Sequence, residues 1–230
     1  MFSPFGFMVT QAGGGAPTNP VTSNLVFGVE FGPGQSYPGS GTTVTDSSTF
    51  GITGVLGAAA TYTSNRYINF TSTATSDLLF TGTFSQLGFQ DEWTVFAYLK
   101  LANTTDSVYI SEKSTNPGFD TFSLVGNYDA GAVRPWNNGY RGMSALSIGT
   151  TLASVAFTKD ANGVANNYKS YKDGSNVVTI SSDFSLLSNT TGVEFNNFDL
   201  GSFDLYNFYY YDRAISAAEV TSLHNYVTSY

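Results

Sequence analysis

The chain has 230 residues, no cysteine, and a formal net charge of −8 that results from 17 acidic against 9 basic residues. The absence of cysteine excludes disulfides, thiolate metal sites and a cysteine nucleophile. A net negative charge disfavours binding to the phosphate backbone of nucleic acids and to anionic membrane surfaces. No segment approaches the roughly 20 consecutive apolar residues that span a bilayer. We therefore expect neither nucleic-acid binding nor membrane insertion.

The first 24 residues differ in composition from the rest of the chain. An apolar head is followed by the segment QAGGGAPTNP, which is typical of a flexible connector. The apolar side chains of the head are Phe2, Phe5, Phe7 and Met8. The head carries no basic residue, so it is a poor secretory signal. The sequence predicts a docking or oligomerisation arm over residues 1–24, with a terminal strand or a frayed tail as the alternative.

From Leu25 onward, segments with a period of two alternate with turn residues, which is the pattern of β-strands. We expect a hairpin over residues 168–180 and strands over residues 25–31, 66–72, 77–84, 92–101, 106–114, 119–129, 140–149, 151–159 and 201–212. Asn162-Gly163 and Asp173-Gly174 supply the positive φ angles of tight hairpin turns. The chain is therefore expected to consist mainly of short strands joined by tight turns.

Two of these strands are informative about burial. The strand over residues 92–101 alternates without a break, and one face carries Trp93, Val95, Ala97 and Leu99. The strand over residues 201–212 carries aromatic residues on both faces, including the three consecutive tyrosines Tyr209–Tyr211. We expect both faces of this last strand to be covered, one by the core and the other by the following helix or a neighbouring strand.

The chain ends with a short helix. Ser216 followed three residues later by Glu219 is a capping box, and Ala217 to Tyr226 forms an amphipathic stripe. Many short strands with a single helix predict an all-β fold, a two-sheet antiparallel jelly-roll sandwich with one short C-terminal helix. Because no linker follows residue 24, we expect one domain over residues 25–230.

Four segments carry a resemblance to a known family. They are SYPGSGTTVTD (36–46), WTVFAYLK (93–100), SYKDGSNV (170–177) and LYNFYYYDRAISAAEV (205–220). Together they resemble laminin-G-like, concanavalin A-like jelly-roll domains, closest to the versions in virion proteins of tailed bacteriophages. The resemblance covers roughly residues 25–227 and implies a sandwich closed by the capped helix. The chain departs from the family pattern at Val44 and at residues 47–51 and 70–72, which argues against a family-type calcium site.

No pattern in the sequence indicates catalysis. Sandwich folds of this type also occur in glucanases, which carry a Glu-x-Asp-x-x-Glu strand that this chain lacks. Its glutamates Glu92, Glu112, Glu194 and Glu219 are scattered. The sole histidine, His224, lies on the terminal helix, and no Gly-x-Ser-x-Gly motif is present, so we expect a solvent-facing or capping histidine. We therefore predict that the protein is not an enzyme.

One loop contains residue types that bind metals. Asp160 and Asn162 in the segment DANG resemble a fragment of a calcium loop. A turn without metal is the favoured interpretation, because no further carboxylate is close in sequence. Calcium would require Asp129 or another loop to converge on the segment. We expect no cofactor, with calcium left open.

The segment over residues 127–142 is the candidate for ligand binding, because an expected loop combines aromatic rings with polar side chains that suit a sugar. The candidate residues are Tyr128, Asp129, Arg134, Trp136, Asn138 and Tyr140. The alternative is that Trp136 fills a gap under the loop or packs at a contact between subunits. Sequence alone leaves both interpretations open.

Two functions from different classes follow from these observations. The first is a non-enzymatic virion protein, a capsid decoration, head-fibre or tail-fibre component, as the resemblance implies. Its arm would dock on a capsid or other virion protein, its lectin-like domain would be displayed on the virion surface, and a homo-oligomer, a trimer, is expected. The alternative is a free-standing lectin that recognises cell-surface glycans through residues 127–142.

Overall fold

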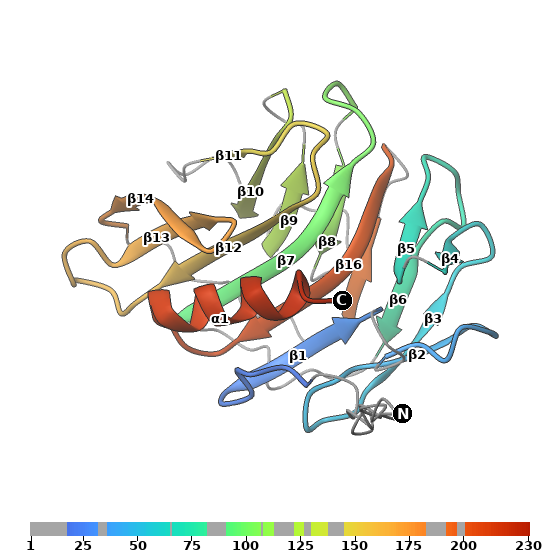
Figure 1. Cartoon of the computed structure of the whole chain (residues 1–230), viewed down its shortest axis with the longest axis horizontal. Helices are drawn as coiled ribbons and strands as arrows, with labels where there is room; N and C mark the ends of the chain where they lie inside the picture. Colours follow the sequence, from blue (N-terminus) through green and yellow to red (C-terminus); the bar gives the residue numbers. More distant parts are fainter. Residues whose placement is uncertain are drawn as a thin grey trace, which may run out of the picture.

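The structure, a computed structural model, is a sandwich of two antiparallel sheets (Figure 1). It describes residues 18–31, 36–64, 66–81, 91–106, 108–112, 122–126, 130–137, 145–182, 192–196 and 201–230. A single helix in this part of the chain lies on the outer face of one sheet. The prediction of an all-β sandwich with one C-terminal helix is confirmed.

The sheet under the helix is named here the front sheet. Its strands are, in spatial order, β14 (Ser175–Ile180), β13 (Tyr168–Lys172), β12 (Ala153–Lys159), β7 (Trp93–Leu101), β16 (Phe203–Tyr211), β5 (Tyr67–Phe70) and β4 (Thr61–Thr63). The first half of β16 pairs with β5, and its second half pairs with β1 (Leu25–Glu30). β16 pairs with β7 along its whole length, which makes it the centre of the sheet.

The other sheet is named the back sheet. Its strands are, in order, β11 (Leu146–Ser147), β10 (Ala132–Asn137), β9 (Phe122–Gly126), β8 (Val108–Glu112), β15 (Gly192–Phe195), β6 (Leu78–Thr81), β3 (Thr53–Leu56) and β2 (Thr43–Thr45). β2, β3, β4 and β15, which have three or four residues each, were not expected. The expectation of a loop over residues 127–142 is wrong for residues 132–137, which form β10.

Apolar side chains from the two sheets fill the space between them. The predicted alternation in β7 is confirmed, because Trp93, Val95, Ala97 and Leu99 are all buried in this core. Between the sheets, the ring of Phe27 contacts that of Phe80 edge-on, with the centroids 4.9 Å apart. Burial of apolar surface of this kind is the main favourable term in folding.

The three consecutive tyrosines of β16 divide between two apolar clusters. Tyr210 points into the core between the sheets, whereas Tyr209 and Tyr211 point to the outer face and pack beneath the helix. The expectation that both faces of this strand are covered is therefore confirmed. The side-chain period of two explains why neighbours in the sequence serve opposite layers.

The helix, α1 (Ala217–Val227), begins at the predicted capping box. The Ser216 side chain accepts a hydrogen bond from the Glu219 backbone, and the Glu219 carboxylate accepts one from Ser216 N at 2.7 Å. Arg213 donates two hydrogen bonds to the same carboxylate, at 3.1 and 2.6 Å. Thr94 Oγ1 on β7 accepts from Ile215 N at 3.0 Å, which anchors the start of the helix on the front sheet.

Residues 18–24, assigned above to the arm, contact the corner between β16 and α1. Val21 is buried in the cluster beneath the helix, and its carbonyl accepts a hydrogen bond from Tyr211 Oη at 3.0 Å. Phe2, Phe5, Phe7 and Met8 lie outside the described residues, and the arm stays a prediction. Within the described residues, no helix has the length and apolar character needed to cross a membrane.

Candidate functional site

The helix covers only part of the outer face of the front sheet. An α-helix is roughly 10–12 Å wide, whereas the nine residues of β7 or β16 extend over about 30 Å. Figure 1 shows α1 crossing in front of β7 and β16, with the end of β7 and the beginning of β16 extending beyond it.

Three half-buried tyrosines form a row across the uncovered part of this face. Tyr67 comes from β5, Tyr206 from β16 and Tyr98 from β7. The ring centroids of Tyr67 and Tyr206 are 4.8 Å apart, with an interplanar angle of 38°. Those of Tyr98 and Tyr206 are 5.2 Å apart, with an angle of 52°. These three residues, named here the tyrosine row, are tilted against one another, and each keeps part of its surface exposed.

A β-bulge in β16 produces this arrangement. The pairing of β16 with β7 shifts between Leu205 and Asn207, so Tyr206 and Asn207 together oppose Tyr98. Asn207 bonds to Tyr209 on the helix-covered face, and Tyr206 joins the tyrosine row. Without the extra residue, the strand could not place two consecutive side chains on the same face.

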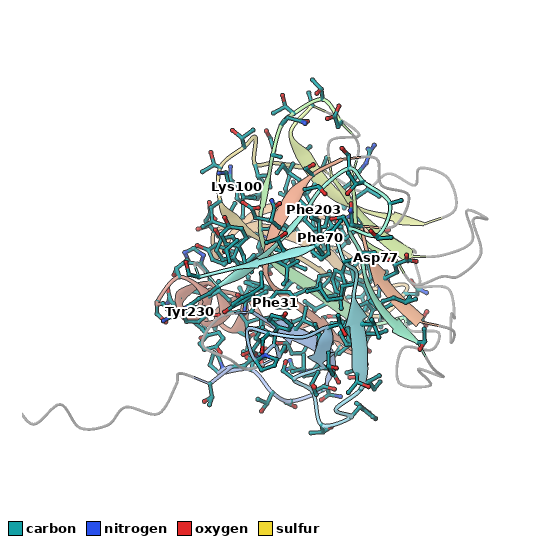
Figure 2. The ribbon with its side chains drawn as sticks, turned by 90° about the vertical axis from the view of Figure 1, so that its right-hand side faces the viewer. Phe31, Phe70, Asp77, Lys100, Phe203 and Tyr230 are labelled. Carbon is teal, nitrogen blue, oxygen red and sulfur yellow. The ribbon has the colours of Figure 1, made fainter. Side chains whose placement is uncertain are left out.

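A second row, of polar residues, runs beside the tyrosine row. Asn69 Nδ2 donates a hydrogen bond to Asp204 Oδ1 at 2.7 Å. Asp204 lies opposite Lys100 on β7, and Asn69 lies opposite Thr61 on β4. Figure 2 shows Lys100 and Tyr230 on the helix side of the sandwich, with Phe70 and Phe203 nearer the middle. We name Thr61, Asn69, Asp204 and Lys100 the polar row.

Two phenol groups of the tyrosine row, those of Tyr98 and Tyr206, have raised pKa values. Burial raises the pKa of Tyr206 to about 12, and the nearby Asp204 carboxylate acts in the same direction. Burial also raises the pKa of Tyr98, and the negative charge of Asp173 adds to this rise. At neutral pH both hydroxyls can donate as well as accept hydrogen bonds, which suits a ligand that carries hydroxyl groups.

The C-terminal residue forms a wall along one side of the tyrosine row. Tyr230 Oη accepts a hydrogen bond from Asn207 Nδ2 at 2.9 Å and donates one to Asn207 Oδ1 at 3.1 Å. The Tyr230 ring meets that of Tyr226 edge-on at 5.4 Å. The exposed guanidinium of Arg66 lies 5.8 Å from the centroid of the Tyr230 ring. These contacts fix the position of Tyr230 next to the row.

A buried carboxylate lies behind this wall. Glu30 at the end of β1 is 2% exposed, and its Oε2 accepts a hydrogen bond from Tyr226 Oη at 2.9 Å. Burial raises the pKa of Glu30, although hydrogen bonds from Tyr226 and Tyr209 oppose the rise. The Glu30 carboxyl group therefore links β1, β16 and the end of α1 in one hydrogen-bonded cluster.

The two rows combine the kinds of surface that a sugar can contact. Tilted aromatic rings provide an apolar surface for the C–H groups of a sugar, and the Asn69–Asp204 pair provides an amide and a carboxylate for its hydroxyls. Asp204 is the single carboxylate in the two rows. In the described part of the chain, no three metal-ligating side chains of the His, Cys, Asp or Glu type cluster together.

Of the six sequence-predicted site residues, the structure describes Arg134 and the backbone of Trp136. Tyr128, Asp129, Asn138 and Tyr140 fall outside the described residues, as does the side chain of Trp136. Arg134 lies on β10 of the back sheet and is 5% exposed, so its side chain presents little surface to a ligand. Glycan binding by residues 127–142 stays a prediction.

The segment that resembles a calcium loop surrounds a lysine. Lys159 is fully buried, and its Nζ donates to the carbonyl oxygens of Asp91 and Asp160 at 3.1 and 2.7 Å and to Asn162 Oδ1 at 2.8 Å. The ammonium group supplies a positive charge where these oxygens converge. Asp129, which the sequence offered as one possible further ligand for calcium, lies outside the described residues.

The sole histidine, expected to be solvent-facing or capping, is half-buried in the last turn of α1 and contacts the front sheet. His224 Nδ1 is 2.9 Å from Ser154 Oγ, but Ser154 is 1% exposed. Asp173 Oδ1 accepts from the backbone N–H of Ser154 at 3.1 Å, so this carboxylate is bonded to the backbone. A buried hydroxyl cannot reach a substrate, so this arrangement holds the helix in place.

Comparisons with known proteins establish the fold but no family. No protein-family model and no curated protein matches the chain. The receptor binding domain of botulinum neurotoxin type G aligns at 12% identity with a TM-score of 0.64, covering 88% of this chain and 51% of that one. The binding domain of Paraclostridial Mosquitocidal Protein 1 aligns at 15% identity with a TM-score of 0.62, covering 89% and 52%.

The binding domain of botulinum neurotoxin DC, solved in complex with SialylT, aligns at 10% identity with a TM-score of 0.64 and covers 90% of this chain and 52% of that one. At such low identity the likeness shows the fold alone. The chain spans about half the length of these structures, so the receptor binding named for them belongs to the larger domains. None of these toxin structures supports the expected link to bacteriophages.

Proposed function

We propose that the chain is a carbohydrate-binding module that binds glycans through the tyrosine row and the polar row. The observation that carries the proposal is the row of three half-buried tyrosines beside a hydrogen-bonded amide and carboxylate. Such a combination of aromatic surface and a few fixed polar groups is typical of small-molecule and sugar sites. The proposal agrees with the lectin hypothesis and moves its site from residues 127–142 to the front sheet.

The structural neighbours support the same class of ligand. The botulinum neurotoxin DC domain was solved with SialylT, and the type C neurotoxin depends on two ganglioside molecules to enter cells. Glycan binding is thus found among proteins that share this fold. The virion role, the capsid partner, the trimer and the virion-surface location gain no such support, and we propose no second function.

Binding to a glycan array tests the proposal directly. We expect the wild-type protein to bind at least one glycan and Tyr206→Ala to weaken that binding at least tenfold, because Tyr206 contacts both other rings of the row. Phe50→Ala is the matched control, since Phe50 is an exposed aromatic residue outside the front sheet. Its removal should leave binding unchanged.

Thermal melting of each variant separates loss of the site from loss of the fold. Tyr206→Phe, which keeps the ring, is a second variant for the case in which Tyr206→Ala does not fold, and it should retain most of the affinity. The proposal is wrong if no glycan binds, or if the folded Tyr206→Ala protein binds as tightly as the wild type.

A further inference from the structure

The tyrosine row follows the hydrogen-bonding direction of the sheet. Tyr67, Tyr206 and Tyr98 come from three strands that are immediate neighbours, and strands are about 4.8 Å apart in this direction. The ring centroids are spaced at 4.8 and 5.2 Å accordingly. Pyranose rings in an extended β-1,4-linked chain advance by about the same distance. Successive sugar rings laid across the strands would therefore meet successive tyrosines.

The polar row repeats with the same spacing. Asn69 on β5, Asp204 on β16 and Lys100 on β7 are each two positions along the strand from the tyrosine of that strand. Two residues of a strand correspond to roughly 7 Å. Each of the three strands thus presents one aromatic ring and one polar side chain at a matching separation. A ligand built of repeating units would make a similar pair of contacts on every strand.

The borders of the face suit an elongated ligand. Beyond Tyr67, the edge strand β4 places the small side chain of Thr63 opposite that tyrosine. Along one side lie Tyr230 and Arg66. The tyrosine row therefore extends over three strands and ends next to the edge strand of the sheet, so a single terminal sugar would leave most of it unused.

The charges favour a neutral chain. In the polar row the Asp204 carboxylate lies opposite the Lys100 ammonium, so these two charges balance, and the whole chain carries a net charge of −8. A polymer with a carboxylate on every unit would lose next to Asp204 what it gains next to Lys100, and the net charge of the chain would repel it. A neutral sugar can instead donate its hydroxyls to the carboxylate and accept from Asn69.

We infer that the face binds a linear, neutral β-1,4-linked polysaccharide across β5, β16 and β7, with one sugar ring on each strand. The inference rests on the proposed function and adds the class of glycan, its orientation and its minimum length. Three consecutive units fill the three positions, and the unit over Tyr67 lies next to the edge strand β4.

Isothermal titration with cello-oligosaccharides and chito-oligosaccharides of one to six units tests the inference. In at least one series, we expect affinity to rise with each unit up to the third and then to level off. Oligomannuronates of the same lengths, which are β-1,4-linked and anionic, should bind more weakly. Tyr67→Ala should abolish the gain from the third unit and leave the affinity for the disaccharide within about twofold of wild type, whereas Tyr67→Phe should keep the gain.

The possible outcomes separate this inference from the proposed function. If a single sugar binds as tightly as the trimer, or if neither series binds while the array shows Tyr206-dependent binding of another glycan, the inference is wrong and the proposed function stands. An equal loss for all chain lengths in Tyr67→Ala would also refute the assignment of one sugar to each strand. If no glycan binds in either experiment, both proposals fail.

Discussion

Replacement of the buried Glu30 by glutamine should make stability less dependent on pH. Glu30 is 2% exposed, and burial raises the pKa of its carboxyl in the folded state above the ordinary value of 4.5. In the unfolded chain the group ionises near that ordinary value. Between the two pKa values the folded protein holds a proton that the unfolded chain has lost. The stability contributed by this group is complete below the unfolded pKa and is lost as the pH rises through the folded pKa.

The size of the effect follows from proton linkage. The free energy of unfolding of the wild type should fall relative to Glu30→Gln by up to about 1.4 kcal/mol for each pH unit in this window. For a protein of this size, 1 kcal/mol corresponds to roughly 2–4 °C in the midpoint of thermal unfolding. Glutamine keeps an oxygen that can accept the hydrogen bond from Tyr226 Oη and carries no charge to desolvate.

Urea unfolding at pH 5, 6, 7 and 8, followed by tryptophan fluorescence, measures this difference. Glu92→Gln is the matched control, because Glu92 is exposed and its replacement should leave the pH profile close to that of the wild type. A difference between wild type and Glu30→Gln that is constant across the pH range would refute the reasoning. So would a wild type that gains stability relative to this variant as the pH rises.

Three further substitutions test the packing around the site by the free energy of unfolding in urea. Gly28→Ala should cost about 1–3 kcal/mol, because the new Cβ would lie 2.8 Å from Ser47 Oγ and 3.0 Å from Tyr209 Cδ1. Lys159→Met should cost about 2 kcal/mol, because the oxygens that surround the ammonium lose their donor. Leu223→Ala should cost about 2–5 kcal/mol, since this fully buried side chain joins α1 to the front sheet.

For each of these three variants, one result of the unfolding experiment would contradict the prediction. Unchanged stability in Gly28→Ala would show that β1 can move away from β16. A Lys159→Met protein as stable as the wild type would mean that water satisfies the oxygens after the ammonium is removed. A cost below 1 kcal/mol for Leu223→Ala would show that the helix contributes little to the fold.

The sequence by itself determined the elements that depend on local patterns. The alternation in β7 and the capping box at Ser216 are confirmed, as are the positive φ angles of Asp173 and Gly174, which are 49° and 76°. These features involve residues within a few positions of one another, so their physical cause is contained in a short segment. The shortest strands escaped recognition, because three residues such as Thr43–Thr45 are insufficient to display a period.

The candidate site was decided by the tertiary structure. Tyr67, Tyr98 and Tyr206 are far apart in the sequence, and they form a row only because β5, β16 and β7 are neighbours in the front sheet. A one-residue difference in the pairing would have turned Tyr206 to the other face, and a β-bulge next to Leu205 sets that register. Strand order and register result from packing between distant segments, whereas a sequence pattern reports only on neighbours along the chain.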